Sequence, residues 1–540
     1  MPINHKHTLF TGGRIFTADP ENPWAEALVV SQEKVLFVGD TESALLHGKA
    51  AAVYDLNGGL VVPGFVDGHV HISMTGAAML KAQLQDAGSL EEIQRRVKAW
   101  ADKNPDAPRV LGTNWVHGDI PGGVPSREML DNIVPDRPVY LEAYDYHSSW
   151  VNTAALEELG ITDDTPDPVG GRIVREESSG RATGYLLENA SVNYVWSLLG
   201  NVSEMELEQH IRTALGAFAR AGITTVVDMA MEEPALRVLE NMYAAGTLPV
   251  RVIAHMIIWR DSDPAKELAM VERAARLAEK YQGDGLRVAG IKIIADGTID
   301  SCTAALSRPY TNGENAGPIW PADVLNPVVV AADHAGLQVA IHAIGDQAVT
   351  LAVDAMECAM GLNNSSGRRH RIEHLEYAKE QDIERMGRLG ITASMQPVHV
   401  DPAYLDNWRE MLGPERANQG WAWPLYQAAG SKLAFGTDTP TAPYFPLINM
   451  YLASTRKSPK EPSAVPVRPD WALKLDSAIV AGTRDSAWAS WLDHCTGTLK
   501  AGLAADLVVL DQDVIAGGAD SLLNTNVRLT LVNGKTTFQN

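Results

Sequence analysis

Six residues of types that bind metal ions or move protons stand at similar places along the chain. Each lies near the end of a short stretch rich in Val, Ile and Ala, and together they are His69, His71, Lys292, His342, His374 and Asp438. In a strand, residues two apart point to the same side, so both histidines of the His69–His71 pair can reach one ion. Imidazoles and carboxylates are the ligands that Zn²⁺ and similar ions prefer. The set therefore predicts a metal site with one or two divalent ions per chain, zinc first among them.

Each of these residues also has a simpler explanation. A His-x-His pair is common in strands, and His342 alone would fit a core histidine bonded to a backbone carbonyl. His374 follows Glu373, with which it would form a surface pair, and Asp438 would serve as a turn residue or helix N-cap. Lys292 is harder to explain, because burying an ammonium group without a partner is costly, although a lysine stem can carry its charge to solvent. The joint arrangement favours the metal site, because five separate strand ends carry a suitable residue type.

The elements that must position these residues are eight short apolar stretches separated mostly by helical patterns, such as 263–281. Near-continuous runs of Val, Ile and Ala are typical of strands covered on both faces. We expect a (β/α)₈ TIM barrel, with an open doubly wound sheet as the alternative. In such barrels the carboxyl ends of the strands carry the chemistry. The expected strands are 60–72, 222–229, 250–257, 288–297, 337–345, 368–376, 391–397 and 432–438.

The two ends of the chain have a different pattern, with short strands of alternating β-formers and turns. Neither end is long enough to bury a good core alone, so we expect 1–60 and 496–540 to form one small β-sandwich domain. The barrel would then occupy 61–495. About 73–221 is too long for one crossover helix, which predicts a large insertion over the active-site face.

Composition narrows the class of protein. The 540 residues include 45 Lys and Arg against 67 Asp and Glu, a formal net charge of −22, which argues against nucleic acid or an anionic membrane as partner. The three cysteines, Cys302, Cys358 and Cys495, form neither a disulfide framework nor a CxxC site. With no evident signal peptide, a cytoplasmic location is expected. The expected partners are a small-molecule substrate and a second copy of the chain in a homodimer.

The segment PGFVDGHVHI resembles the first-strand signature of the amidohydrolase superfamily. The order of His-x-His, then Lys, His, His and Asp on later strands is similar to its binuclear branch. The segments that resemble this family are spread over almost the whole chain, and include GGRIFTAD, IKIIADGTIDSCTAAL, IHAIGDQAV, RIEHLEY and FGTDTP. They place the chain near the amidohydrolase 3 group, with YtcJ-like proteins and N-substituted formamide deformylases. One scaffold in this family carries many chemistries, so the resemblance leaves the substrate open.

The resemblance also implies roles for the metal-site residues. His69 and His71 would hold one metal, and His342 and His374 a second. Lys292 would be carbamylated and bridge the two, and Asp438 would contact metal and take the proton from the attacking water. Some relatives use one metal and no bridging lysine, which leaves a mononuclear site open.

Four further residues are candidate substrate contacts. His147 stands in Asp145-Tyr146-His147, which resembles a family Asp-x-His segment that reaches the active site, so a catalytic role is also considered. Trp115 and Tyr444 would supply apolar walls, and His399 follows the seventh expected strand. The simpler alternative for each aromatic residue is core or lid packing.

We therefore predict a hydrolase that cleaves a non-peptide C–N bond, such as that of an N-formyl or N-acyl amine, with water activated by metal. A bound ion lowers the pKa of water to about 7, and a carboxylate beside that water is a natural general base. The first alternative is a mononuclear aminohydrolase, a deaminase. The second is a non-catalytic binding protein on the same barrel.

Overall fold

The computed structural model describes residues 7–47, 52–144, 148–168 and 171–540. By its internal contacts the chain divides into two compact units, Met1–Ile72 with Leu215–Asn540, and Ser73–Ala214. The insertion expected at about 73–221 covers the second unit. No helix in the described part of the chain is long and apolar enough to cross a membrane.

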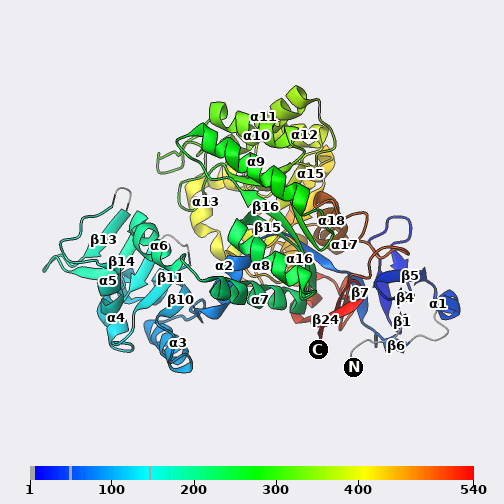
Figure 1. The fold of residues 1–540 in the computed structure, drawn as a ribbon, viewed down its shortest axis with the longest axis horizontal. Helices are drawn as coiled ribbons and strands as arrows, with labels where there is room; N and C mark the ends of the chain where they lie inside the picture. Colours follow the sequence, from blue (N-terminus) through cyan, green and yellow to red (C-terminus); the bar gives the residue numbers. More distant parts are fainter. Residues whose placement is uncertain (1–6, 48–51, 145–147, 169–170) are drawn as a thin grey trace. The chain divides into compact units, whose positions relative to one another are not determined.

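The first unit contains a barrel of eight parallel strands, which confirms the predicted fold class (Figure 1). A parallel bridge between Val70 and Thr439 links the first strand to the chain just beyond the last, and so closes the ring. Helices α8 (Glu233–Ala244), α9 (Pro264–Lys280), α10 (Ala322–His334), α11 (Asp346–Asn363), α12 (Glu380–Leu389) and α15 (Trp423–Ala429) alternate with the strands. The strands in order are β8 (Phe65–Val70), β15 (Ile223–Met231), β16 (Arg251–Ile257), β17 (Leu286–Ile294), β18 (Gln338–Ala343), β19 (Arg371–His374), β20 (Thr392–Met395) and β21 (Leu433–Phe435).

The expected first strand, 60–72, is two strands in the structure. β7 (Leu60–Pro63) pairs with strands from the ends of the chain, and only β8 joins the barrel. The chain changes sheets at Pro63-Gly64, because proline lacks the N–H that would continue a ladder. A side chain at Gly64 would meet Thr224 of the neighbouring strand, since a Cβ there would lie 2.2 Å from its Oγ1. The long apolar run concealed this break.

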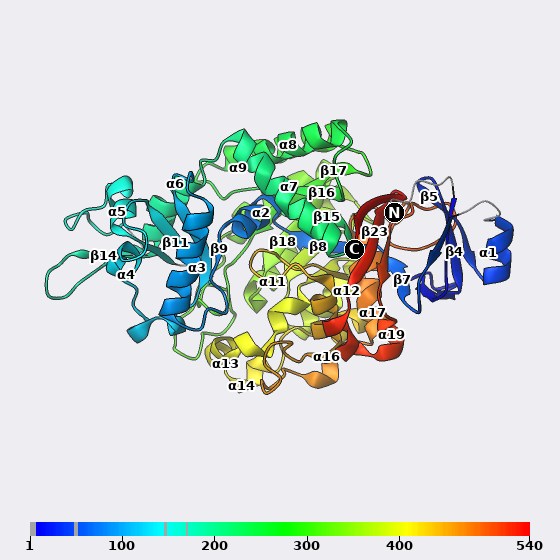
Figure 2. The same cartoon turned by 90° about the horizontal axis from the view of Figure 1, so that it is seen from below.

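N-terminal strands form one further sheet of the first unit, in the order β5 (Lys34–Gly39), β4 (Ala27–Ser31), β1 (His7–Thr11) and β6 (Ala52–Asp55). Strands from both ends of the chain form another, in the order β24 (Lys535–Gln539), β23 (Val527–Val532), β22 (Leu507–Leu510), β7, β2 (Arg14–Phe16) and β3 (Trp24–Ala25). β22 runs antiparallel between β7 and β23, so red and blue segments lie side by side in Figure 2. One hydrophobic cluster joins residues of both ends, among them Phe10, Ile15, Leu507 and Leu529. A separate sandwich domain stays a prediction, because both ends belong to the same compact unit as the barrel.

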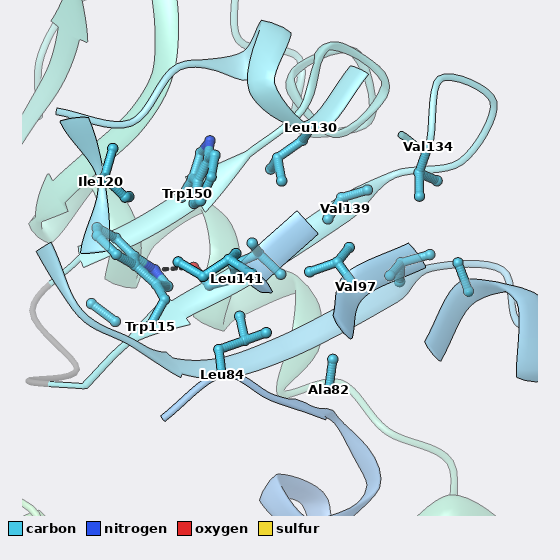
Figure 3. Packing of buried hydrophobic residues seen from close by; sticks show 14 of the residues in the cluster. Ala82, Leu84, Val97, Trp115, Ile120, Leu130, Val134, Val139, Leu141 and Trp150 are labelled. Carbon is cyan, nitrogen blue, oxygen red and sulfur yellow. Dashed lines mark hydrogen bonds between the residues drawn. The ribbon is translucent and has the colours of Figure 1, made fainter. Parts of the chain in front are cut away.

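The second unit is built on a six-stranded sheet of order β13 (Gly171–Arg175), β14 (Ala182–Glu188), β12 (Ser148–Val151), β11 (Val139–Ala143), β10 (Val110–Trp115) and β9 (Ala82–Gln83). β11 pairs parallel with β10 on one side and antiparallel with β12 on the other. Helix α3 (Leu90–Lys103) contributes its apolar face to the core through Ile93, Val97 and Ala101. Figure 3 shows this core, with Trp115 and Trp150 packed among aliphatic side chains.

Candidate metal centre

Histidine side chains and one carboxylate converge at the carboxyl ends of the barrel strands. Ligand atoms of His69, His374 and Asp438 all lie within 4.8 Å of one another, and the three residues are buried. The His71 Nε2 atom lies 3.0 Å from Asp438 Oδ1, and the His69 Nε2 atom lies 3.3 Å from the same oxygen. The strand-one pair therefore points to one side, as its spacing predicts. Asp438 is the common partner of both histidines.

His342 and His374 extend the cluster from β18 and β19. Their ring centroids are 4.3 Å apart, and the His374 centroid lies 5.0 Å from that of His69. His374 and Asp438 both have positive φ, 75° and 59°, as the chain turns away from the strand ends. The His342 Nε2 atom also lies 3.3 Å from the Gly297 carbonyl oxygen. The carbonyl contact named above as the simpler explanation for His342 is therefore present in the structure.

Lys292 lies inside the barrel on β17 and is only 2% exposed. Within the described part of the chain its ammonium group has no hydrogen bond or ion pair. Burial lowers the pKa of Lys292 to about 8, although the charges of Glu373 and Asp438 act in the opposite direction. A buried amine with no ion-pair partner is costly to keep charged.

Burial also favours the neutral form of the His69 and His342 imidazoles. It lowers the pKa of His69 to about 4 and that of His342 to about 3, with a further contribution in both from the Lys292 charge. The pKa of Asp438 lies well below its usual range, because contacts with His69, His71 and His374 outweigh the effect of burial. Neutral imidazoles beside an ionised carboxylate are the protonation states in which these groups bind metal.

This donor set fits a divalent ion. The imidazole nitrogens and the carboxylate are borderline and hard ligands of the kind zinc takes. The His374 Nδ1 atom is buried and has no hydrogen-bond partner among the described residues, as a ligand atom would be in the absence of its ion.

Two carboxylates that the sequence analysis did not single out support the site. Glu373 is fully buried and lies 2.8 Å from His69 Nδ1, so the interpretation of Glu373 and His374 as a surface pair is wrong. Asp67 accepts hydrogen bonds from the backbone N–H of His69 and from the backbone and hydroxyl of Thr437. The Thr437 hydroxyl therefore holds Asp67 and not Asp438. Asp67 lies two residues before His69, and Glu373 lies two residues after Arg371. Residues two apart share one face of a strand, so this spacing is the sequence signal that could have indicated both carboxylates.

The candidate substrate contacts are scattered. The His399 Nε2 atom lies 3.7 Å from Asp438 Oδ2, and its ring is parallel to that of His374 with centroids 5.9 Å apart. Burial lowers the pKa of His399, but the nearby carboxylates of Glu376 and Asp438 outweigh it and the net shift is upward. Tyr444 packs its ring against Phe218 and Phe445. His147 lies outside the described residues.

Trp115 belongs to the core of the second unit (Figure 3). Its indole N–H donates to the Leu141 carbonyl at 3.1 Å, and its ring meets that of Trp150 with centroids 5.8 Å apart. Its side chain is fully buried, so this structure gives it a packing role. A substrate contact for Trp115 stays a prediction with no support from these contacts.

Comparison with known proteins identifies the family of this chain. Residues 52–538 match the model of the amidohydrolase family. The chain is 31% identical to the protein LONG AFTER FAR-RED 3 of Arabidopsis thaliana, over 93% of this chain and 86% of that protein. It is 26% identical to the N-substituted formamide deformylase of Arthrobacter pascens, over 97% of each.

A solved structure shows the same fold. It is an uncharacterized metal-dependent hydrolase from Pyrococcus horikoshii, 27% identical, with a TM-score of 0.77 over 94% of this chain and 98% of that one. These matches confirm the resemblance inferred from the sequence motifs, and the hypothesis of a non-catalytic binding protein is wrong. The chain therefore belongs to the amidohydrolase family and is a hydrolase of carbon–nitrogen bonds other than peptide bonds.

Proposed function

We propose that this hydrolase cleaves the C–N bond of an N-formyl or other N-acyl amine with the help of divalent metal, zinc in the first instance. The observation that carries the proposal is the convergence of His69, His374 and Asp438 within 4.8 Å. The similarity to an N-substituted formamide deformylase supports the N-formyl class. The similarity to a metal-dependent hydrolase supports the metal.

Four histidines would hold the metal, His69 and His71 from the first strand and His342 and His374 from the fifth and sixth. A bound divalent ion lowers the pKa of water and polarises the substrate carbonyl. Asp438 lies within 3.3 Å of the Nε2 atoms of both His69 and His71, beside the place where that water would stand.

Asp438 acts as the proton carrier. The water oxygen bonds to the formyl carbon while the carboxylate takes a proton from that water. The C–N bond then breaks, and Asp438 gives the proton to the leaving nitrogen. The products are formate, or the corresponding acid, and the free amine.

Lys292 would bridge two metal ions after reaction with CO₂. Its amine nitrogen bonds to the carbon of CO₂ and loses a proton, which leaves a carbamate with a negative charge. This change supplies oxygen ligands and removes an ammonium group that is buried without an ion-pair partner among the described residues.

A mononuclear aminohydrolase is the second candidate. It is favoured by the size of the His69–His374–Asp438 cluster, which suits one ion, and by the absence of any hydrogen bond between Lys292 and these residues in the described part of the chain.

A substrate screen separates the two. Zinc-loaded protein is assayed for formate or acid release from N-formyl amines, N-acyl amines, cyclic amides and dipeptides, and for ammonia release from amino-substituted rings. Metal content is measured on the same sample. We expect acid and amine as products, with the chelator-treated protein as the control. Ammonia release with one ion per chain and no turnover of any amide would favour the deaminase.

A further inference from the structure

A buried ion pair lies directly beneath the metal centre. Arg371 and Glu373 stand two residues apart on β19, both point into the barrel, and both are fully buried. The Arg371 Nε atom donates to Glu373 Oε1 at 2.6 Å, and its Nη2 atom lies 3.2 Å from Oε2. Neither residue is among the metal ligands proposed above.

Glu373 is joined to one of those ligands. Its Oε2 atom lies 2.8 Å from the Nδ1 atom of His69, whose ring is also buried. A neutral imidazole carries its proton on only one nitrogen, and an ionised carboxylate can only accept. The proton of His69 is therefore on Nδ1, and the lone pair of Nε2 faces Asp438 Oδ1, 3.3 Å away.

One other side chain approaches the same nitrogen. The Gln396 Nε2 atom lies 3.3 Å from His69 Nδ1, while its Oε1 atom has no partner among the described residues. The carboxylate contact is shorter and charge-assisted, so it decides the tautomer. Rotation of the Gln396 amide by half a turn would present an oxygen to the same N–H.

Arg371 fixes both the carboxylate and the backbone that carries His69. Its Nη2 atom donates to the Gly68 carbonyl at 2.7 Å and to the Ser394 hydroxyl at 2.6 Å. The guanidinium thus ties β19 to β8 and β20, and it contacts the peptide immediately before His69. Arg371 also balances the charge of Glu373 inside the barrel.

We propose that Glu373, held by Arg371, is a positioning residue that fixes the tautomer and the ring orientation of His69 and thereby sets the affinity of the centre for its metal. This inference rests on the metal site proposed above. The alternative is a purely structural ion pair, which would stabilise the barrel and leave metal affinity unchanged.

The variant Glu373→Gln separates these two roles. Glutamine keeps the size of the side chain and an acceptor oxygen but removes the charge. Co²⁺ and Zn²⁺ affinities are measured by competition with a chromophoric chelator, together with the visible Co²⁺ spectrum and the melting temperature. Loss of a partner that orients a metal-binding histidine typically costs about 10- to 100-fold in metal affinity, and we expect a loss in this range.

Two further variants serve as controls. Glu373→Gln leaves Arg371 buried without a counter-ion, so the double variant Arg371→Met/Glu373→Gln restores neutrality and should recover stability while binding metal as weakly. Asp333→Asn alters another buried carboxylate of the same unit, one that contacts His370 and Asn363. It should lose stability and keep full metal affinity.

The outcomes are distinct. Weakened binding and an altered Co²⁺ spectrum in folded Glu373→Gln and in the double variant support the positioning role. Unchanged affinity and spectrum in both overturn it and leave a structural ion pair. If the wild-type protein itself takes up neither ion, the metal site is wrong and this inference falls with it.

Discussion

The Nε2 atom of His71 lies 3.0 Å from Oδ1 of Asp438, although the two residues are 367 positions apart in the chain. The contact joins the segment after the first barrel strand to the segment after the last. It places the proposed proton carrier against the metal-binding pair.

Asp438→Asn should lose about 10²–10⁴-fold in kcat, because an amide cannot accept the proton as a carboxylate does. The fold and much of the metal should remain, since asparagine keeps the shape and one ligand oxygen. Equal losses in kcat and kcat/KM would place the role in the transition state. A variant with near-normal kcat and an unchanged acidic limb of the pH–rate profile would show that Asp438 is not the base, and His399 would be tested next.

Replacing His69 or His71 with alanine should remove most bound metal and nearly all activity. Ligands act together to fix the coordination geometry of an ion, so the loss of either histidine side chain should weaken binding of the ion. Elemental analysis and kinetics on the purified variants provide the check, with His334→Ala, an exposed histidine in the last turn of α10, as the matched control. Normal metal content and full activity in either strand-one variant would make that histidine structural.

Lys292→Ala should lose activity, and short carboxylates added to the solution should restore part of it by replacing the carbamate oxygens. Lys292→Arg should not respond, because a guanidinium cannot be carbamylated and keeps its charge. Crystallographic density at Nζ of the wild-type, zinc-loaded protein tests the modification directly. An unmodified lysine beside a single, fully occupied ion would decide for the mononuclear alternative.

The ion pair between Arg251 and Asp506 should contribute strongly to stability. It joins β16 to the residue before β22, with Nε 2.7 Å from Oδ2 and both side chains buried. Asp506→Asn leaves the arginine buried without its counter-ion, a change that typically costs about 3–5 kcal/mol. Urea unfolding gives the measurement.

The partly exposed pair Arg273–Glu233 is the matched control for that experiment. Glu233→Gln should cost no more than about 1 kcal/mol, because solvent screens an exposed pair. If Asp506→Asn and Glu233→Gln lost the same free energy of unfolding, burial would not be the reason for the stability of the Arg251–Asp506 pair.

Asp333 should make stability depend on pH in the acid range. Burial raises its pKa, but hydrogen bonds from His370, Asn363 and Ser365 outweigh this and hold it below the ordinary value. The unfolded chain therefore binds the proton first, so the stabilisation is complete above about pH 4 and is lost as the pH falls further. Asp333→Asn should be less stable by about 1–3 kcal/mol near neutral pH, with a difference that shrinks below pH 4. A constant difference across this range would contradict the assignment.

The convergence of the proposed metal ligands could be predicted because strand periodicity and barrel geometry are local and repetitive. Apolar runs locate the strands, and all carboxyl ends meet on one face. The break at Pro63-Gly64 was missed because β7 and β8 are both apolar, and only long-range pairing shows that they belong to different sheets.

The roles of the supporting carboxylates Glu373 and Asp67 could not be predicted from the sequence. Glu373 and Arg371 are charged residues that composition alone would place at the surface. Their burial depends on each other and on His69, from a strand some 300 residues earlier. Trp115 shows the opposite difficulty, since an aromatic residue suited to a pocket wall is equally suited to a core, and the structure packs it in one.

The contact between His71 and Asp438 has a consequence for how the protein is made. At about 5–20 residues per second, a ribosome needs roughly 20–70 s to pass from one residue to the other. During that time the histidine pair of the first strand has no carboxylate partner, and the ring of strands has no closing edge. A nascent or truncated chain that ends before β21 therefore carries half of a metal centre on an open sheet.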